Sequence, residues 1–194
     1  MNQQALSAFI WSVADLLRGD YKQSDYGKII LPFTVLRRLD CVLESTKEAV
    51  LAEYAHKQKA ELNPEPFLLR KAKQSFYNTS PLDMKKLMGD QDHIKENLFS
   101  YIQGFSEAVR DIFKRFEFYA QIDKLAKSGL LYQVTEKFVN VDLHPDKISN
   151  SQMGLVFEEL IRKFAEISNE TAGEHFTPRE VIRLMVNLLF IEDD

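Results

Sequence analysis

The sequence has little of what secreted and membrane proteins need. Its 194 residues contain a single cysteine, Cys41, so no disulfide can form within the chain, which is typical of a reducing cytoplasm. No run of apolar residues approaches the roughly 18 to 20 that a membrane-spanning helix requires, and the N-terminus lacks the pattern of a signal peptide. We therefore expect a soluble, cytoplasmic protein with no membrane partner.

Glycine and proline are also scarce. Seven Gly and six Pro stand against fourteen Phe and seven Tyr, which favours packed helices over a turn-rich β protein. No two glycines are two residues apart, so the chain lacks a glycine-rich loop that would let its backbone approach a cofactor closely. A metal site is not expected, because Cys41 has no partner and the histidines are scattered. No residue is assigned a catalytic role.

An excess of positive charge is missing as well. The net charge is −4, so the chain has no global attraction to nucleic acid, and any contact with DNA must come from a local patch. With 45% hydrophobic and 28% charged residues, the chain can bury a core and remain in solution.

Helical periodicity of apolar residues runs through most of the chain and predicts an all-α, multi-helix fold. Residues 2–18 form the first predicted helix, with Trp11 beside its apolar stripe, where we interpret it as a residue at the edge of the core and not as a platform for base stacking. A longer helical stretch begins at Ser24 or Asp25, and Pro32 either kinks it or marks its true start. Further helices are predicted within 57–73, near Ser80 or Pro81, on both sides of Gly104, and over the ranges 118–131, 132–141 and 150–167. Ser149 and Gln152 form a capping-box pair that opens the last of these.

Two local features are explained without a functional role. The run from Asn63 to Pro66 resembles the Asn-Pro-Pro-aromatic loop of adenine methyltransferases, but Glu65 and Pro66 replace the second proline and the aromatic ring, so we interpret it as a helix stop. The five cations between Lys57 and Lys73 are interspersed with acids, and a solvated face explains them better than DNA binding does.

Arg37 and Arg38 lie side by side in the middle of the second helical stretch. One interpretation is a solvated pair that bonds to nearby acids such as Asp40 and Glu44. The other is a contact with DNA phosphate or a partner protein, because the guanidinium offers a rigid fork of several donors. Both interpretations stay open from the residues alone.

The stretch from Gly173 to Leu189 carries a well-defined helix start. Thr177 is placed as N-cap, and Glu180 lies three residues on to complete a capping box. Pro178 falls at the first helical position, where its missing N–H has no cost. Ahead of the cap come Glu174, His175 and Phe176, next to a helix N-terminus of the kind that holds anions.

Three segments carry a resemblance to one family. GEHFTPREVIRLMV, from residue 173, resembles the segment that precedes the cofactor loop of amino-group DNA methyltransferases. More narrowly, it resembles the modification subunit of type I restriction–modification systems. LPFTVLRRLDCVL, from residue 31, and MGLVFEELIRKFAE, from residue 153, are similar to the helical N-terminal domain of the same subunit and occur in the same order.

The resemblance implies S-adenosylmethionine as cofactor and methyl transfer to adenine N6 by a full-length subunit that flips the base out of the duplex. It places Glu174, His175, Phe176, Thr177 and Pro178 against the methionine end of the cofactor. It also implies four partners: DNA, a specificity subunit, a second modification subunit and a restriction subunit.

Domain organisation follows from the same comparison. Residues 1–167 are expected to form the helical domain, which would help to enclose DNA and contact partner subunits. Residues 168–194 would be a hinge and the first helix of the methyltransferase domain, whose α/β sheet would follow. Because the cofactor loop and the Asn-Pro-Pro-aromatic motif are missing from these 194 residues, we expect them to be inactive by themselves.

Two alternatives remain from different classes. A helical interaction module without enzymatic activity fits the helix content and mixed charge equally well, but leaves the segment from Glu174 to Pro178 unexplained. A stand-alone DNA-binding protein that uses Arg37, Arg38 and the 57–73 region would bind DNA with a steep salt dependence. The acidic net charge disfavours it.

Overall fold

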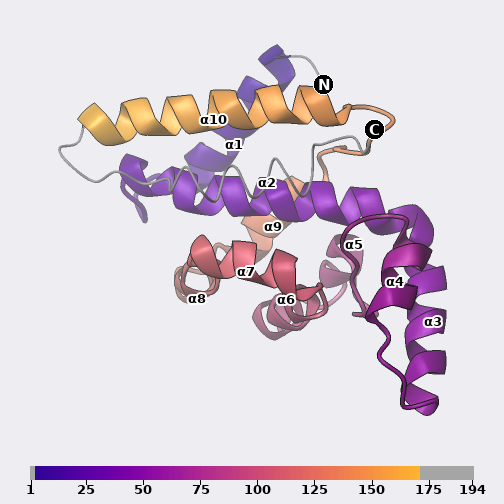
Figure 1. Cartoon of the computed structure of the whole chain (residues 1–194). Helices are drawn as coiled ribbons and strands as arrows, with labels where there is room; N and C mark the ends of the chain where they lie inside the picture. Colours follow the sequence, from indigo (N-terminus) through magenta and orange to yellow (C-terminus); the bar gives the residue numbers. More distant parts are fainter. Residues whose placement is uncertain (1–2, 171–194) are drawn as a thin grey trace.

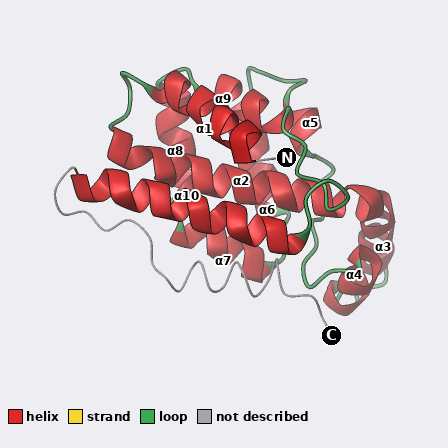
Figure 2. Cartoon of the chain, turned by 90° about the horizontal axis from the view of Figure 1, so that it is seen from above, coloured by secondary structure: helices red, strands yellow, loops and turns green. Residues whose placement is uncertain are grey.

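The computed structural model describes residues 3–170, with the side chains of residues 4–166. The predicted cofactor segment and the helix after Thr177 lie outside this part. Within it the secondary structure is helical and no strand is present, which confirms the all-α prediction (Figures 1 and 2). The α-helices of this part are α1 (Gln3–Leu17), α2 (Tyr26–Leu43), α3 (Lys47–Lys59), α4 (Glu65–Ala72), α5 (Met84–Leu87), α6 (Ile94–Gln103), α7 (Glu107–Arg115), α8 (Phe118–Lys127), α9 (Leu131–Val139) and α10 (Asn150–Glu170).

Helix α2 is the element on which the others pack. The periodicity predicts one buried face, but 14 of its 18 residues are buried, including Val35 and Arg38. This happens because α1, α8, α9 and α10 all contact α2 (Figure 1), and a helix covered all round has no face left for water. Pro32 lies inside α2 and does not start it.

Aromatic rings link the helices below α2. Phe33 of α2 stacks on Phe138 of α9 at 5.1 Å between centroids, and meets Phe118 of α8 edge-on at 5.0 Å. Phe9 of α1 reaches Phe138, and Phe113 of α7 reaches Phe118. The contacts between these five rings join α1, α2, α7, α8 and α9.

Helix α10 lies antiparallel to α2, as both views show (Figures 1 and 2). Near its start, Asn150 accepts a hydrogen bond from Arg38, in the second half of α2. Fourteen residues on, the ring of Phe164 packs on Gly27, where a Cβ would come within 3.0 Å of it. The predicted capping box is confirmed: Ser149 N–H donates to Gln152 Oε1, and Gln152 N–H donates to Ser149 Oγ.

Three local expectations differ from the structure. The run from Asn63 to Pro66 does more than stop a helix: Asn63 Oδ1 accepts from Glu65 N–H and the run starts α4, because proline is tolerated in the first turn. The short helix begins after Asp83, whose side chain caps it, and not near Ser80. Trp11 is 56% exposed, so placing it at the edge of the core was wrong.

A solvated face accounts for only some of the cations in the 57–73 region. Lys57 packs its amino group 3.7 Å from the centroid of the Phe67 ring, so it links α3 to α4. Its side chain is only 12% exposed and lies 3.4 Å from Glu53. In the described part of the chain, no helix is both long enough and apolar enough to cross a membrane.

Candidate functional site

Of the residues singled out from the sequence, Arg37 and Arg38 are described by the structure, whereas Glu174, His175, Phe176, Thr177 and Pro178 lie outside the described residues. The two arginines are neighbours on α2, but they point to different surroundings. Neither is solvated, because the Arg37 side chain is 16% exposed and Arg38 is 1% exposed.

Arg38 holds the loop before α10. Its Nη1 donates to the carbonyl oxygens of Leu143 and Ile148, at 2.6 and 2.8 Å, and its Nη2 donates to Asn150 Oδ1 at 2.9 Å. A side chain so buried is not accessible to a DNA phosphate in this conformation. Its hydrogen bonds place the start of α10 beside α2.

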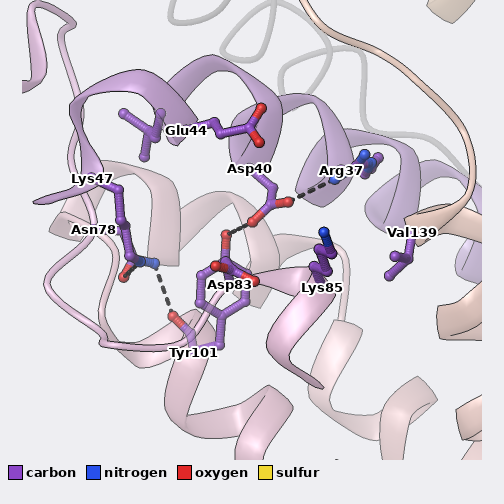
Figure 3. A pocket seen from close by; sticks show the side chains of 10 residues that line it. Arg37, Asp40, Glu44, Lys47, Asn78, Asp83, Lys85, Tyr101 and Val139 are labelled. Carbon is purple, nitrogen blue, oxygen red and sulfur yellow. Dashed lines mark hydrogen bonds and ion pairs between the residues drawn. The ribbon is translucent and has the colours of Figure 1, made fainter. Parts of the chain in front are cut away.

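Arg37 belongs to a second cluster, centred on Asp40 (Figure 3). Its Nη1 donates to Asp40 Oδ2 at 2.8 Å, as the pairing with nearby acids predicts, and its Nε donates to the carbonyl of Val141. Asp40 Oδ1 also accepts from Tyr101 Oη at 2.6 Å and from Met84 N–H at 3.1 Å. One carboxylate thus connects α2 with α5 and α6.

Lys47, at the start of α3, completes this cluster. Its amino group donates to the carbonyl of Leu82 at 2.7 Å, lies 3.5 Å from Asn78 Oδ1, and stands 5.3 Å from the centroid of the Tyr101 ring. Together with Arg37, Asp40, Asp83 and other side chains, Lys47 and Tyr101 line a cavity of about 140 Å³ (Figure 3).

Burial controls the protonation of this cluster. Desolvation raises the pKa of Asp40, and the hydrogen bond from Tyr101 opposes that rise. Burial also raises the pKa of Tyr101 well above its ordinary value. The pKa of Lys47 is lowered to about 8 by desolvation, although Asp40 and Asp83 work against this.

The arrangement is that of a structural junction. The cavity is lined by three basic residues, Arg37, Lys47 and Lys85, and by three acidic residues, Asp40, Glu44 and Asp83, so it carries no excess charge that would favour DNA phosphate. Asp40, Lys47 and Tyr101 use their polar atoms to join segments up to 61 residues apart. Sequence reasoning missed Lys47 and Tyr101, because nothing local marks a contact at that separation.

The described residues therefore form a helical domain built around one buried helix. Two family models match the chain, one after the other. The model of the HsdM N-terminal domain matches residues 6–138, and the model of the N-6 DNA methylase matches residues 148–194. The first match covers well over half of the chain, so the chain belongs to the HsdM N-terminal domain family. The resemblance to the modification subunit of type I restriction–modification systems is confirmed.

A curated relative that matches the chain is itself named as a methylase subunit. The type I restriction enzyme MjaIX methylase subunit of Methanocaldococcus jannaschii is 22% identical over 199 residues. The alignment covers 94% of this chain but 35% of that protein, so the chain spans about a third of the relative's length.

Proposed function

We propose that this chain is the helical part of a DNA methyltransferase subunit that transfers a methyl group from S-adenosylmethionine to adenine N6 in a recognition site. The order of the two family matches along the chain supports this, as does the methylase named in the relative. The alternative of a helical interaction module without enzymatic lineage is not favoured, because it gives no reason for a methylase match after residue 148.

The observation that carries the proposal is the position of α10. This helix lies within the residues matched by the methylase model, yet it packs along α2, within the HsdM N-terminal domain match. Arg38 bonds to Asn150 at its start, and Gly27 packs against Phe164, fourteen residues further along. We infer that α10 is the rigid connection through which the helical domain positions the methyltransferase domain, with the domain boundary near residue 168.

The proposed cofactor contacts lie in the segment from Glu174 to Pro178. The described residues contain no glycine-rich loop, so we derive no step of methyl transfer from them. Phe176 and Glu174 would contact the cofactor directly, while Thr177 would cap the helix beside it. None of these residues is expected to carry out proton transfer.

A binding experiment tests this assignment. In the full-length subunit, Phe176→Ala should weaken S-adenosylmethionine binding about fivefold or more, because a lost aromatic contact is worth about 1–3 kcal/mol. Isothermal titration of the cofactor measures it, and Thr171→Ala, in the preceding polar stretch, is the control. Equal affinity in Phe176→Ala and the wild type would remove Phe176 from the site.

Contacts with DNA and with specificity, restriction and second modification subunits are proposed for the helical domain as a whole. For Arg37 and Arg38 the proposed part in these contacts is indirect: they hold the 141–150 loop on α2. A direct role for these arginines in a stand-alone DNA-binding protein would require the 194-residue chain to bind DNA with a steep salt dependence. Electrophoretic shift at about 50 and about 200 mM salt distinguishes the two.

A further inference from the structure

Arg110 lies on α7 and has no partner among the described residues. Its guanidinium makes no hydrogen bond there, and no carboxylate of residues 4–166 lies within ion-pair distance of it. Nε is shielded from water, whereas Nη1 and Nη2 keep accessible surface. Arg115, further along the same helix, pairs instead with Asp111 at 3.0 Å. Arg110 therefore presents both of its Nη groups to solvent without an acceptor on this part of the chain.

Tyr77 is brought close to this arginine by the start of α7. Ser106, the residue before the helix, donates its N–H to the carbonyl of Tyr77 at 3.0 Å, and its own carbonyl accepts from the N–H of Arg110 at 3.1 Å. Burial raises the pKa of Tyr77, Glu65 adds to the rise, and Arg110 opposes it. The charge of Arg110 therefore reaches the phenol of Tyr77, as expected for a side chain one helical turn from the main-chain partner of that residue.

Tyr119 of α8 belongs to the same surface. Burial raises its pKa, against the hydrogen bond from Gln103 and the charge of Arg110. Gln103 donates to Tyr119 Oη at 2.6 Å, and the centroid of the Phe99 ring lies 5.2 Å from that of Tyr119. These contacts hold the ring in place and leave its O–H free to donate. Tyr77 Oη is also accessible and makes no hydrogen bond with the described residues. Two half-buried tyrosines thus share a surface with a half-buried arginine, and their polar tips are available.

We propose that Arg110, Tyr77 and Tyr119 form a docking site for a partner protein, which binds through an acidic peptide segment. A carboxylate of that segment pairs with Nη1 and Nη2 of Arg110 through two parallel hydrogen bonds, which the planar guanidinium favours. Tyrosine and arginine are enriched among the residues that dominate the binding energy of protein interfaces. The bound carboxylate gives Arg110 the counter-charge that the described residues lack.

A DNA backbone suits this surface less well than a peptide. Arg110 offers a single charge, and acidic side chains lie nearby: Glu65 acts on Tyr77, and the exposed Glu107 precedes Arg110 by one turn of α7. A duplex carries about one phosphate charge per 1.7 Å of its axis, so it would meet these carboxylates together with the arginine. A short peptide can place one carboxylate on Arg110 and neutral residues elsewhere. The proposal does not depend on methyltransferase activity.

The test is a selection of random peptides displayed on phage against the immobilised 194-residue chain. The recovered peptides should share an Asp or Glu, and fluorescence polarisation should show that they bind Arg110→Gln about tenfold more weakly than the wild type, or worse, because the charge pair is lost. Arg115→Gln, on the same helix, is the matched control and should bind them like the wild type. Peptides without a shared acid, or equal affinity for wild type and Arg110→Gln, would overturn the proposal.

A substitution in the peptide keeps the test independent of how the variant chain folds. Exchange of the shared acid for its amide should weaken binding to the wild type about as much as Arg110→Gln does, and both changes together should cost little more than either one. Additive losses would show that the acid and Arg110 do not pair. A labelled DNA duplex that is retarded in a gel by the wild type, but not by Arg110→Gln, would assign the arginine to phosphate and refute the peptide site.

Discussion

At the residue scale, buried polar side chains connect segments that are distant in the sequence. Asp40 receives hydrogen bonds from Arg37, Tyr101 and the main chain of Met84, and Arg38 donates to the loop before α10. Each satisfied bond is worth about 1 kcal/mol, but leaving one partner buried and unpaired costs more. These residues therefore contribute more to determining which segments come into contact than to net stability.

Lys47 makes a pH dependence measurable. Its pKa is about 8 in the folded chain, against the ordinary lysine value of 10.5 that applies when the chain is unfolded. Between these pH values the unfolded state binds more protons, so stability rises with pH. The free energy of unfolding of the wild type, relative to Lys47→Met, should therefore increase from about pH 7.5 to about pH 10. After a discount for partial exposure, we expect about 1 kcal/mol or more.

Urea denaturation at both pH values measures this difference. Lys47→Arg is the control, because an arginine stays charged throughout the range and should show no such gain. A wild-type advantage over Lys47→Met that does not change with pH would mean that the amino group is not desolvated as the structure indicates.

At the element scale, glycines mark where segments approach most closely. Gly104 ends α6 in an ordinary helical conformation, so its backbone does not require glycine. The requirement is spatial, because a Cβ there would lie 2.7 Å from both Asn78 Oδ1 and Ser80 N. Among the described residues, and apart from its own helix backbone, Gly154 in α10 has no neighbouring atom within 4 Å of the same position. The two glycines therefore differ in function although both belong to helices or their caps.

This difference predicts opposite effects of one substitution. Gly104→Ala should destabilise the chain by about 1–3 kcal/mol, because the backbone of Ser80 must move. Gly154→Ala should stabilise it by about 1 kcal/mol, because alanine is the better helix former. Thermal unfolding of both variants beside the wild type measures the pair. A stable Gly104→Ala would show that the loop from Asn78 can retreat without cost.

At the scale of the whole molecule, α2 and the aromatic rings beneath it make one continuous core. Phe33 contacts rings from two different helices, and both of those rings contact a further one. Aromatic pairs add about 0.5–1.5 kcal/mol beyond the area they bury. Loss of the Phe33 ring should therefore destabilise the whole domain and not α2 alone.

Phe33→Ala should lower the free energy of unfolding by about 3–5 kcal/mol, as expected for a fully buried phenylalanine. Phe99→Ala, at a partly buried ring that pairs with Tyr119, should cost clearly less. Urea denaturation followed by circular dichroism measures both. Similar losses in the two variants would contradict a core centred on Phe33.

Much of the helix pattern could be predicted from the residues. Periodicity indicated α1, α2 and the paired helices around Gly104, and the Ser149–Gln152 capping box predicted the start of α10. These features depend on residues within about four positions of each other, where helix geometry alone determines which side chains come into contact. Trp11 was misplaced because its position beside the apolar stripe does not say whether another helix covers it.

The sequence by itself determined the helical class and, through three family-like segments, the family to which the chain belongs. Only the tertiary structure decided that α2 is buried on every side, that Arg38 holds α10, and that Asp40 bonds to Tyr101. The reason is physical. A helix forms from contacts between near neighbours, whereas the burial of a side chain depends on the helices packed around it, and these come from distant parts of the chain.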